Sequence, residues 1–256
     1  MRSLRDATVL FAVILMARVR PTRTTTAETR PTRYWWAQHI VSPIATGIVV
    51  SLVFLSCEEN RLARSQRSEL IASVLVTNDL RDIVLAEQDL RGIVLTQRDL
   101  SGSNFFDSDL TGAGFFEAKL HGATLAIADL SGVRAYGADL TEANLNKAVA
   151  LGADLEKAKL VRATLANADL SGASLIEADL SSANLSWAVF EGADLRRAQL
   201  ANAHVVQTDF TDANLEGADL RGVDLSSADL SGTRLDGVLC NEATVLPAGL
   251  TPCGSS

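Results

Sequence analysis

The sequence predicts a solenoid, a fold in which short extended segments turn at regular intervals and stack coil upon coil. A large apolar residue recurs at every fifth position, and a small residue stands two places before it. Strict steps of five fit neither a helix, which needs apolar steps of three and four, nor a strand, which needs steps of two. One unit alone cannot bury its apolar face, so only stacked coils form a continuous core.

The chain begins with a basic segment, residues 1–33, that includes a short apolar run over 7–17. This run has the length of a signal-peptide hydrophobic region, but no small-residue cleavage site follows it. Residues 1–57 hold seven Arg against two acids, whereas 58–256 hold 16 basic and 29 acidic residues. An acidic body lacks the Lys and Arg footprint that phosphates require, so no direct nucleic-acid binding is expected.

Residues 34–57 are predicted to form a transmembrane helix. They carry no formal charge, and a spanning helix needs about 20 mostly apolar residues. Trp35 and Trp36 stand where a headgroup layer would lie, and five Arg precede them. The pattern predicts a single-pass membrane protein, bound to the membrane through 34–57, with the repeat on the extracytoplasmic side. The alternative is a buried helix of a soluble protein, because two polar residues and Pro43 interrupt the apolar run.

A short linker or capping helix is predicted over 58–73, where Leu and Ile alternate with charged residues, and the repeat itself over 74–240. Of the 29 fifth positions from Leu100 to Cys240, 25 are Leu or Phe, and Ala stands two residues earlier in 21 cases. These columns predict the core. Its expected members include Leu120, Leu130, Leu140, Leu155, Leu165, Leu170, Leu180, Phe190, Leu195, Phe210, Leu220 and Leu230.

The repeated unit is A-(D/N)-L-x-x, as in Ala128-Asp129-Leu130 and Ala183-Asn184-Leu185. It resembles the motif of the pentapeptide-repeat proteins and matches nearly every unit between Ser108 and Leu235. The resemblance implies an all-β fold, a right-handed quadrilateral β-helix with four units to a square coil and the Leu and Ala columns inside. Here it would follow the N-terminal membrane helix.

Coils of 20 residues would stack side chains that are 20 positions apart. Phe115 would then lie beside Ala135, a large residue compensating a small one, and Phe190 beside Phe210. Glycines at ten-residue intervals suggest that alternate corners need a glycine conformation. In the first coil, polar residues occupy Ala positions, as at Gln88 and Arg98, so that coil is either wider and wetter or in a different register.

A column of aspartates could be interpreted as a cation-binding or catalytic ladder. The stronger interpretation is structural, because short Asp and Asn side chains bond to backbone amides in turns. The three His residues have no Cys or paired carboxylate at metal-ligand spacing, and no nucleophile has an adjacent base. We therefore expect no enzyme, and no catalytic, cofactor-binding or metal site.

Two smaller features complete the sequence-based predictions. Cys240 and Cys253 bracket the C-terminal tail, 241–256, which abandons the repeat and is expected to cap the last coil; the alternatives are a disulfide, if the domain is exported, or two thiols. Phe106, Phe116 and Tyr136 directly follow core positions, so the resemblance implies that they face outward. Grouped surface aromatics mark a candidate partner surface.

Two functions follow. The first is a non-enzymatic, membrane-anchored scaffold or spacer that binds an unidentified protein partner. The second comes from the resemblance alone: some acidic family members mimic duplex DNA and bind type II topoisomerases such as gyrase. The predicted membrane segment and the absence of a long C-terminal helix weigh against the second.

Overall fold

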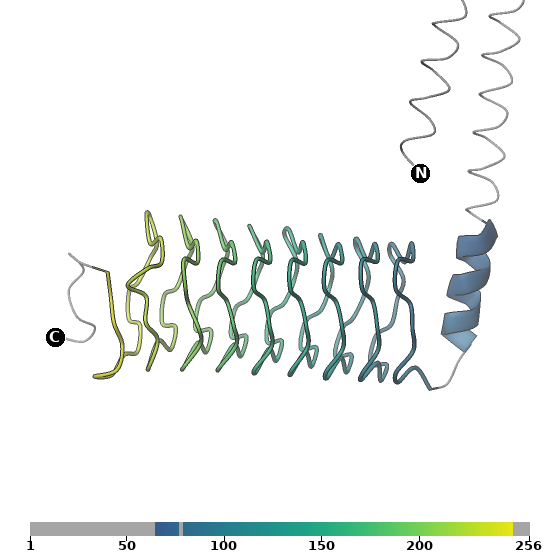
Figure 1. Ribbon diagram of the computed structural model, residues 1–256, viewed down its shortest axis with the longest axis horizontal. Coiled ribbons are helices and arrows are strands. Elements are labelled where there is room, and N and C mark those ends of the chain that lie inside the picture. The colour runs from purple at the N-terminus through teal and green to yellow at the C-terminus, as the bar shows by residue number, and fades with distance from the viewer. Residues whose placement is uncertain (1–64, 77–78, 248–256) are drawn as a thin grey trace, which may run out of the picture. The chain divides into compact units, whose positions relative to one another are not determined.

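The computed structural model describes residues 65–76 and 79–247. Residues 65–76 form a helix, and 79–247 form stacked coils (Figure 1). Backbone pairing is parallel and joins residues 20 apart, as in Asp109 to Asp129 and Asp129 to Val149. Four five-residue units therefore make one square coil. At about 4.8 Å per coil, the roughly eight coils extend about 38 Å.

Each flat side of a coil contributes one bridged residue before the chain turns again. Leu165 N–H donates to the Asn184 carbonyl at 2.8 Å, and Asn184 N–H donates to the Ala163 carbonyl at 2.9 Å. Because a turn follows within two residues, the pairing never extends, and residues 79–247 contain isolated bridges rather than strands. The prediction of an all-β fold is corrected in this respect.

The predicted core positions lie on the inside of the coils. Eleven of the twelve are buried, and Leu230, which lies near the C-terminal end of the stack, is partly buried. Phe190 and Phe210 stack with ring centroids 5.2 Å apart and an interplanar angle of 14°, which confirms that predicted pairing. At roughly 1.5 to 3 kcal/mol for each buried Leu, this column is the main source of stability.

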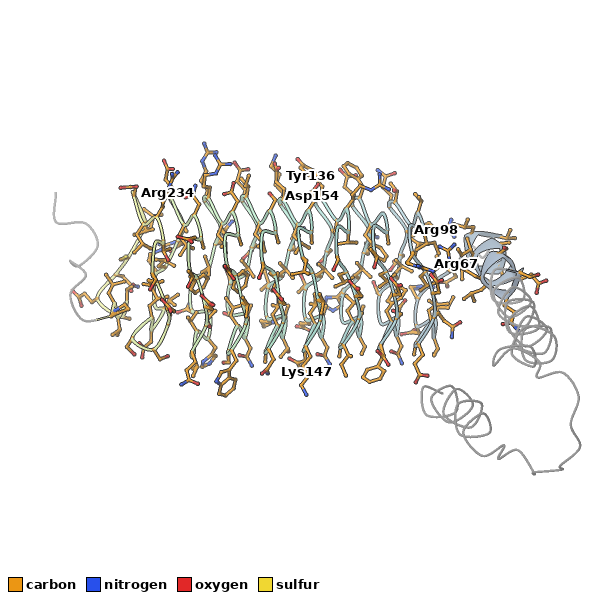
Figure 2. All side chains as sticks on the ribbon, turned by 90° about the horizontal axis from the view of Figure 1, so that it is seen from above. Arg67, Arg98, Tyr136, Lys147, Asp154 and Arg234 are labelled. Atoms are coloured by element: carbon orange, nitrogen blue, oxygen red, sulfur yellow. The ribbon has the colours of Figure 1, made fainter. Side chains whose placement is uncertain are left out.

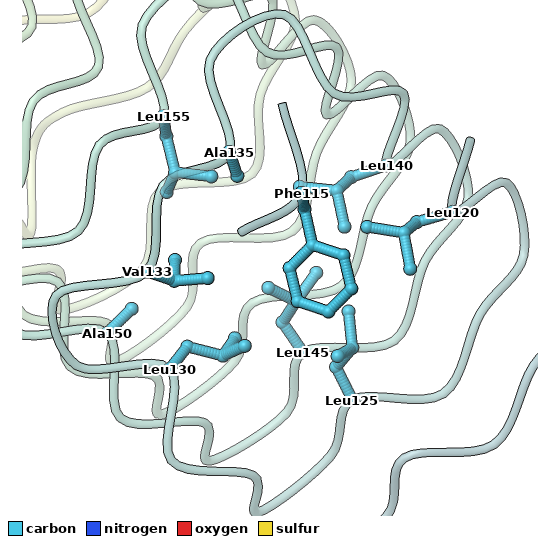
Figure 3. Close-up of a pocket in the computed structure, with 10 residues that line it drawn as sticks. All are labelled: Phe115, Leu120, Leu125, Leu130, Val133, Ala135, Leu140, Leu145, Ala150 and Leu155. Carbon is cyan, nitrogen blue, oxygen red and sulfur yellow. The ribbon is translucent and has the colours of Figure 1, made fainter. Parts of the chain in front are cut away.

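The core is not filled everywhere. Phe115 points into the interior above Ala135, as expected, yet a cavity of about 20 Å³ remains beside Ala135 and Ala150 (Figure 3). All ten lining residues are apolar. A cavity of this size has room for a single water, but it offers no polar partner and is expected to stay dry. Phe115 therefore compensates for only part of the missing side-chain volume.

Filling this cavity should stabilise the fold. We expect Ala150→Val to raise the free energy of unfolding by about 1 kcal/mol, because its two methyl groups enter apolar space that is already empty. A chain of this size should gain about 2–4 °C in Tm, which differential scanning calorimetry would measure. Val205 shows that the column accepts valine. Ala168→Val, in a filled part of the core, is the control and should lower Tm; a lower Tm for Ala150→Val would contradict the assignment of free space.

Nearly every corner, rather than every second one, uses the left-handed backbone region; between Asp82 and Gly237 the exception is Ser227. The second turn residue has φ between 50° and 76° at 31 positions, of which 18 are not glycine. A Cβ added to Gly102 would lie 2.1 Å from Asp82 Oδ1, and one added to Gly232 would lie 2.1 Å from Asp212 Oδ1, so a side chain at either position would displace the end of an aspartate side chain. The expectation of alternate glycine corners was thus too narrow.

The helix packs on the first coil. Val74 is buried in the core, and Leu70 and Ile71 are partly buried against it. The first coil keeps the register of the others, since Val84 pairs with Asn104 and Asp89 with Asp109. Gln88 is exposed, and its side-chain amide donates to the Ala86 carbonyl at 3.0 Å. The polar residue turns outward, so a shift of register is excluded.

The prediction of a single-pass membrane protein is contradicted. In the described ranges, 65–76 and 79–247, no helix has the length and apolar character needed to cross a bilayer. The helix over 65–76 is about 18 Å long, whereas the hydrocarbon core of a bilayer is about 30 Å thick. The segment 34–57, on which the prediction was based, lies outside the described residues.

Candidate protein-interaction surface

The stacked turns form four edges along the solenoid, and exposed aromatics lie on two of them. We call one the Tyr136 edge; its turn residues are 96–97, 116–117, 136–137, 156–157, 176–177, 196–197, 216–217 and 236–237. The diagonally opposite one is the Trp187 edge, with turn residues 86–87, 106–107, 126–127, 146–147, 166–167, 186–187, 206–207 and 226–227. Each edge repeats every 20 residues because residues 20 apart pair in successive coils, which stacks their turns on one another.

Phe116 and Tyr136 form a stacked pair on the Tyr136 edge. Their centroids lie 5.5 Å apart with an interplanar angle of 9°, and Phe116 is 41% exposed. Lys157 Nζ donates to the Tyr136 hydroxyl at 2.9 Å and lies 5.2 Å from the ring centroid. The hydrogen bond from Lys157 to Tyr136 raises the lysine pKa. The result is a flat aromatic platform with a cation at one end.

Charged side chains extend this surface along the same edge. Glu177 accepts from Arg197 at 2.7 Å and lies 3.9 Å from Lys157 Nζ, while Gln97 donates to Glu117 at 2.9 Å. These pairs join side chains of successive coils. Exposed pairs of this kind contribute little stability but hold long side chains in a defined direction.

Phe106 does not belong to this surface. It lies on the Trp187 edge, half a coil from Phe116 along the chain, and is 37% exposed. Figure 2 shows Tyr136 and Lys147, a residue of the Trp187 edge, on opposite sides of the stack. The predicted three-residue patch is therefore a pair, Phe116 and Tyr136, and a separate aromatic, Phe106. Phe106 and Phe116 are ten residues apart, which is half of a square coil and places them on opposite edges.

The aspartate column has the structural role expected from turn chemistry. Asp109 Oδ1 accepts from Thr111 N–H at 3.1 Å and from its hydroxyl at 2.6 Å, and Asp169 repeats the arrangement with Ser171. Where Arg follows two residues later, as in Asp194–Arg196, the guanidinium also binds the carboxylate. Within the described residues, no group of three or more His, Cys, Asp or Glu side chains could hold a metal ion.

Among these carboxylates, Asp89 is bound by two arginine side chains. It binds Arg91 Nη2 at 2.5 Å and Arg67 Nε of the helix at 3.0 Å. The side-chain hydrogen bond from Arg91 lowers the pKa of Asp89 to about 2, and the charge of Arg67 adds to the effect. The contact thus joins the helix to the first coil electrostatically.

We expect this contact to stabilise the fold in a pH-dependent way. A lowered pKa means that the stabilisation is complete above the unfolded value, about 3.9, and is lost as the pH falls through about 2. The Tm difference between the wild type and Asp89→Asn should therefore be present at neutral pH and should vanish near pH ~2. Thermal melts across this range would measure it, with Asp107→Asn as an exposed control. A difference that persists in acid would contradict the ion pair.

The family model for pentapeptide repeats matches the chain in eight copies between residues 79 and 239. The match covers more than half of the sequence. The chain belongs to the pentapeptide-repeat family. This confirms the sequence-based resemblance, and family membership implies that the β-helix is right-handed.

Several solved pentapeptide-repeat structures are similar to this chain. HetL from the cyanobacterium Nostoc sp. strain PCC 7120, which is involved in regulating heterocyst differentiation, is 28% identical with a TM-score of 0.37 and covers 71% of this chain and 96% of its own. QnrB1, a plasmid-mediated fluoroquinolone resistance protein, is 22% identical with a TM-score of 0.35 and covers 63% and 91%. A protein of the Arabidopsis thaliana thylakoid lumen is 26% identical with a TM-score of 0.23 and covers 54% and 71%. A comparison with curated proteins found no match.

In this pentapeptide-repeat protein, Cys240 is disulfide-bonded. Cys253, its predicted partner, lies outside the described residues, and the pairing stays a prediction. We expect a digest that cleaves after Glu242 to yield the two cysteine-containing peptides linked to each other when no reductant is present, and two separate peptides after reduction. Mass spectrometry would distinguish this from a bond to Cys57, the third cysteine in the sequence.

Sequence reasoning missed two contributors to the surface. Lys157 was not singled out, although an offset of 21 from Tyr136 places it on the next coil of the same edge. Trp187 was also not singled out, although it shares its edge with Phe106 and Ile127. The signal was available in both cases, because each edge has two turn residues per coil, so that residue numbers differing by a multiple of 20, or by one more or one less, lie on one edge.

Proposed function

We propose that this pentapeptide-repeat protein is a non-enzymatic scaffold that binds a protein partner through the Tyr136 edge. The observation that carries the proposal is the exposed stack of Phe116 and Tyr136 with Lys157 at its end. Aromatic residues in rigid surroundings are the usual energetic centres of protein interfaces. The platform also offers a polar handle at the Tyr136 hydroxyl.

The backbone below this platform supports the role. Phe116 O accepts from Gln97 N–H at 2.8 Å, and Tyr136 O accepts from Glu117 N–H at 2.9 Å, so each aromatic is anchored to the preceding coil. A side chain that is already ordered loses little entropy on binding. The same regular pairing makes the stack a stiff spacer that holds its surfaces at fixed separations.

Comparative capture tests this proposal. The full chain, the double variant Phe116→Ser/Tyr136→Ser and the control Leu151→Ser, which removes an equally exposed apolar residue from another edge, would be immobilised and exposed to the same extract. We expect proteins held by the wild type and by the control to be lost from the double variant. Equal retention on all three proteins would reject the Tyr136 edge as the binding surface.

A second candidate function is inhibition of a type II topoisomerase such as gyrase by an acidic surface that takes the place of duplex DNA. The acidic faces beside the Trp187 edge favour it: within 79–247 they and the edge carry nine carboxylates and one basic residue, Lys147. The carboxylates are Glu87, Asp89, Asp107, Asp109, Asp129, Asp169, Asp209, Asp224 and Asp229.

A gyrase supercoiling assay with the full chain tests the second candidate. Inhibition that disappears in Asp209→Asn/Asp229→Asn, but persists in Asp139→Asn/Asp179→Asn on the opposite side, would support it. No inhibition at a large molar excess of the chain would reject it. Neither outcome affects the scaffold proposal, which involves different residues.

A further inference from the structure

The most exposed aromatic of the described chain lies on the edge that the scaffold proposal does not use. Trp187 is 52% exposed, and Val206 on the next coil is 42% exposed. Trp187 Nε1 donates to Gln207 Oε1 at 2.6 Å, which holds the indole along the edge. The backbone of Trp187 has φ 57°, a region that suits Gly or Asn and costs energy for a bulky residue. Neither exposure nor backbone conformation makes tryptophan favourable here for the fold alone.

The regular pairing of coils is interrupted after the coil that carries Val206. His204 pairs with Asn184 of the preceding coil, but no bridge joins His204 to Asp224, although the ladder is continuous on this face from Val84 to His204. Gln207 N–H donates instead to the Ser227 hydroxyl at 3.1 Å. Within residues 84–239, this is the one place where the 20-residue ladder fails. The coil that carries Val206 therefore separates locally from the following coil, whereas Trp187 N–H still donates to the Val206 carbonyl at 2.8 Å.

The charge around this pair has one sign. On the adjoining face Asp169, Val189, Asp209 and Asp229 follow one another by direct backbone pairing. None of these three carboxylates forms an ion pair within the described residues, in contrast to the aspartates that Arg67, Arg91, Arg196 and Arg221 bind elsewhere. The apolar pair and Val189 are thus bordered by carboxylates without cationic partners.

The Tyr136 edge and its two faces differ in charge. Within 79–247 they carry twelve acidic and eight basic residues, many of them paired along the stack, as in Glu177–Arg197. The Trp187 side has nine acidic residues and one basic residue. A partner that approaches from solution meets a predominantly negative field on only one side of the molecule.

We infer that the Trp187 edge is a second interaction surface, which docks a basic, apolar segment of a partner protein. Apolar side chains of the partner would cover Trp187, Val206 and Val189, and its Lys or Arg residues would meet Asp169, Asp209 and Asp229. Charge complementarity of this kind raises association rates and excludes acidic partners, including a second copy through the same edge. The surface is independent of the Tyr136 edge and of the scaffold proposal.

A pair of synthetic peptides tests the inference. One alternates leucine with lysine, the other leucine with glutamate, and binding of each to the full chain is followed by fluorescence anisotropy. We expect the lysine peptide to bind, with an affinity that falls as salt is raised, and the glutamate peptide to bind at least about tenfold more weakly. Failure of the lysine peptide to bind at millimolar concentration would overturn the inference.

Variants assign the binding to this edge. Trp187→Asn/Val206→Asn should weaken the lysine peptide about tenfold, and Asn suits the backbone of position 187. Asp209→Asn/Asp229→Asn should weaken it about threefold and reduce the salt dependence. Phe116→Ser on the Tyr136 edge and Asp139→Asn/Asp179→Asn on the opposite side should change the affinity less than twofold. If Asp139→Asn/Asp179→Asn weakens the peptide as much as Asp209→Asn/Asp229→Asn does, the peptide is attracted to the acidic protein in general, and the assignment to this edge is overturned.

A measurement on the unmodified chain keeps the test valid if a variant fails to fold. In NMR spectra of the full chain, the lysine peptide should shift the Trp187 indole N–H and the Val206 amide signals. Shifts confined to Phe116 and Tyr136 would place the peptide on the other edge and reject the Trp187 surface.

Discussion

Leu165→Asp is expected to abolish the cooperative fold of the repeat. Leu165 is fully buried in the middle of the stack, with coils on both sides. The substitution removes a buried leucine, worth about 2–5 kcal/mol, and places a carboxylate in the dry column at a further cost of several kcal/mol. The sum approaches the 5–15 kcal/mol that typically stabilises a whole domain. Far-UV circular dichroism should show a lost or broadened thermal transition.

The control for this prediction lies two residues away. Asn167→Asp introduces the same charge on the outside of the same coil, at a position with φ 59° that Asp tolerates. We expect its Tm to stay close to that of the wild type. A cooperative, unchanged transition in Leu165→Asp would mean that the column of fifth residues is not the core.

Phe190→Ala is expected to cost about 3–5 kcal/mol of unfolding free energy. Phe190 is fully buried and stacks on Phe210, so truncation removes a large apolar side chain and leaves a cavity that the paired coils cannot close. Urea unfolding followed by circular dichroism would measure the change. This loss of unfolding free energy should be several times larger than the gain expected from Ala150→Val.

A double-mutant cycle refines the second prediction. Phe210→Ala alone should cost a similar amount, and the double variant should cost less than the sum by about 0.5–1.5 kcal/mol, because the two rings contact each other. Phe116→Ala, an exposed aromatic, is the control and should cost less than about 1 kcal/mol. Strict additivity of the two core variants would contradict the stacked geometry.

Most of the fold was predictable from the five-residue period. The column from Leu100 to Leu220 followed from counting, because a period that never slips allows few ways to bury the same residue repeatedly. The 20-residue coil, and with it the pair Phe190 and Phe210, followed from the resemblance to pentapeptide-repeat proteins. The prediction of alternate glycine corners failed, since glycine marks only some of the positions at which φ is positive. Composition alone could not distinguish a glycine that a neighbouring side chain crowds, such as Gly102, from one in open space, such as Gly92.

The candidate surfaces were less predictable. The same position in the five-residue unit is occupied by Phe106, Phe116 and Tyr136. This position indicates that the three side chains face outward, but it does not indicate on which side of the stack each one lies. The side depends on the position within the 20-residue coil, which places Phe106 on the Trp187 edge and the other two on the Tyr136 edge. Lys157 joins Tyr136 across coils at an offset of 21 for the same reason.

The amino-acid sequence by itself determined that one residue in five is buried and that the chain must turn between these residues, because the pattern fits no other regular structure. Only the tertiary structure decided which outward residues meet. It placed the break in pairing between His204 and Asp224 and left the cavity beside Ala135 and Ala150 open. These features depend on distances between coils, and contacts between residues 20 apart form only when the stack closes.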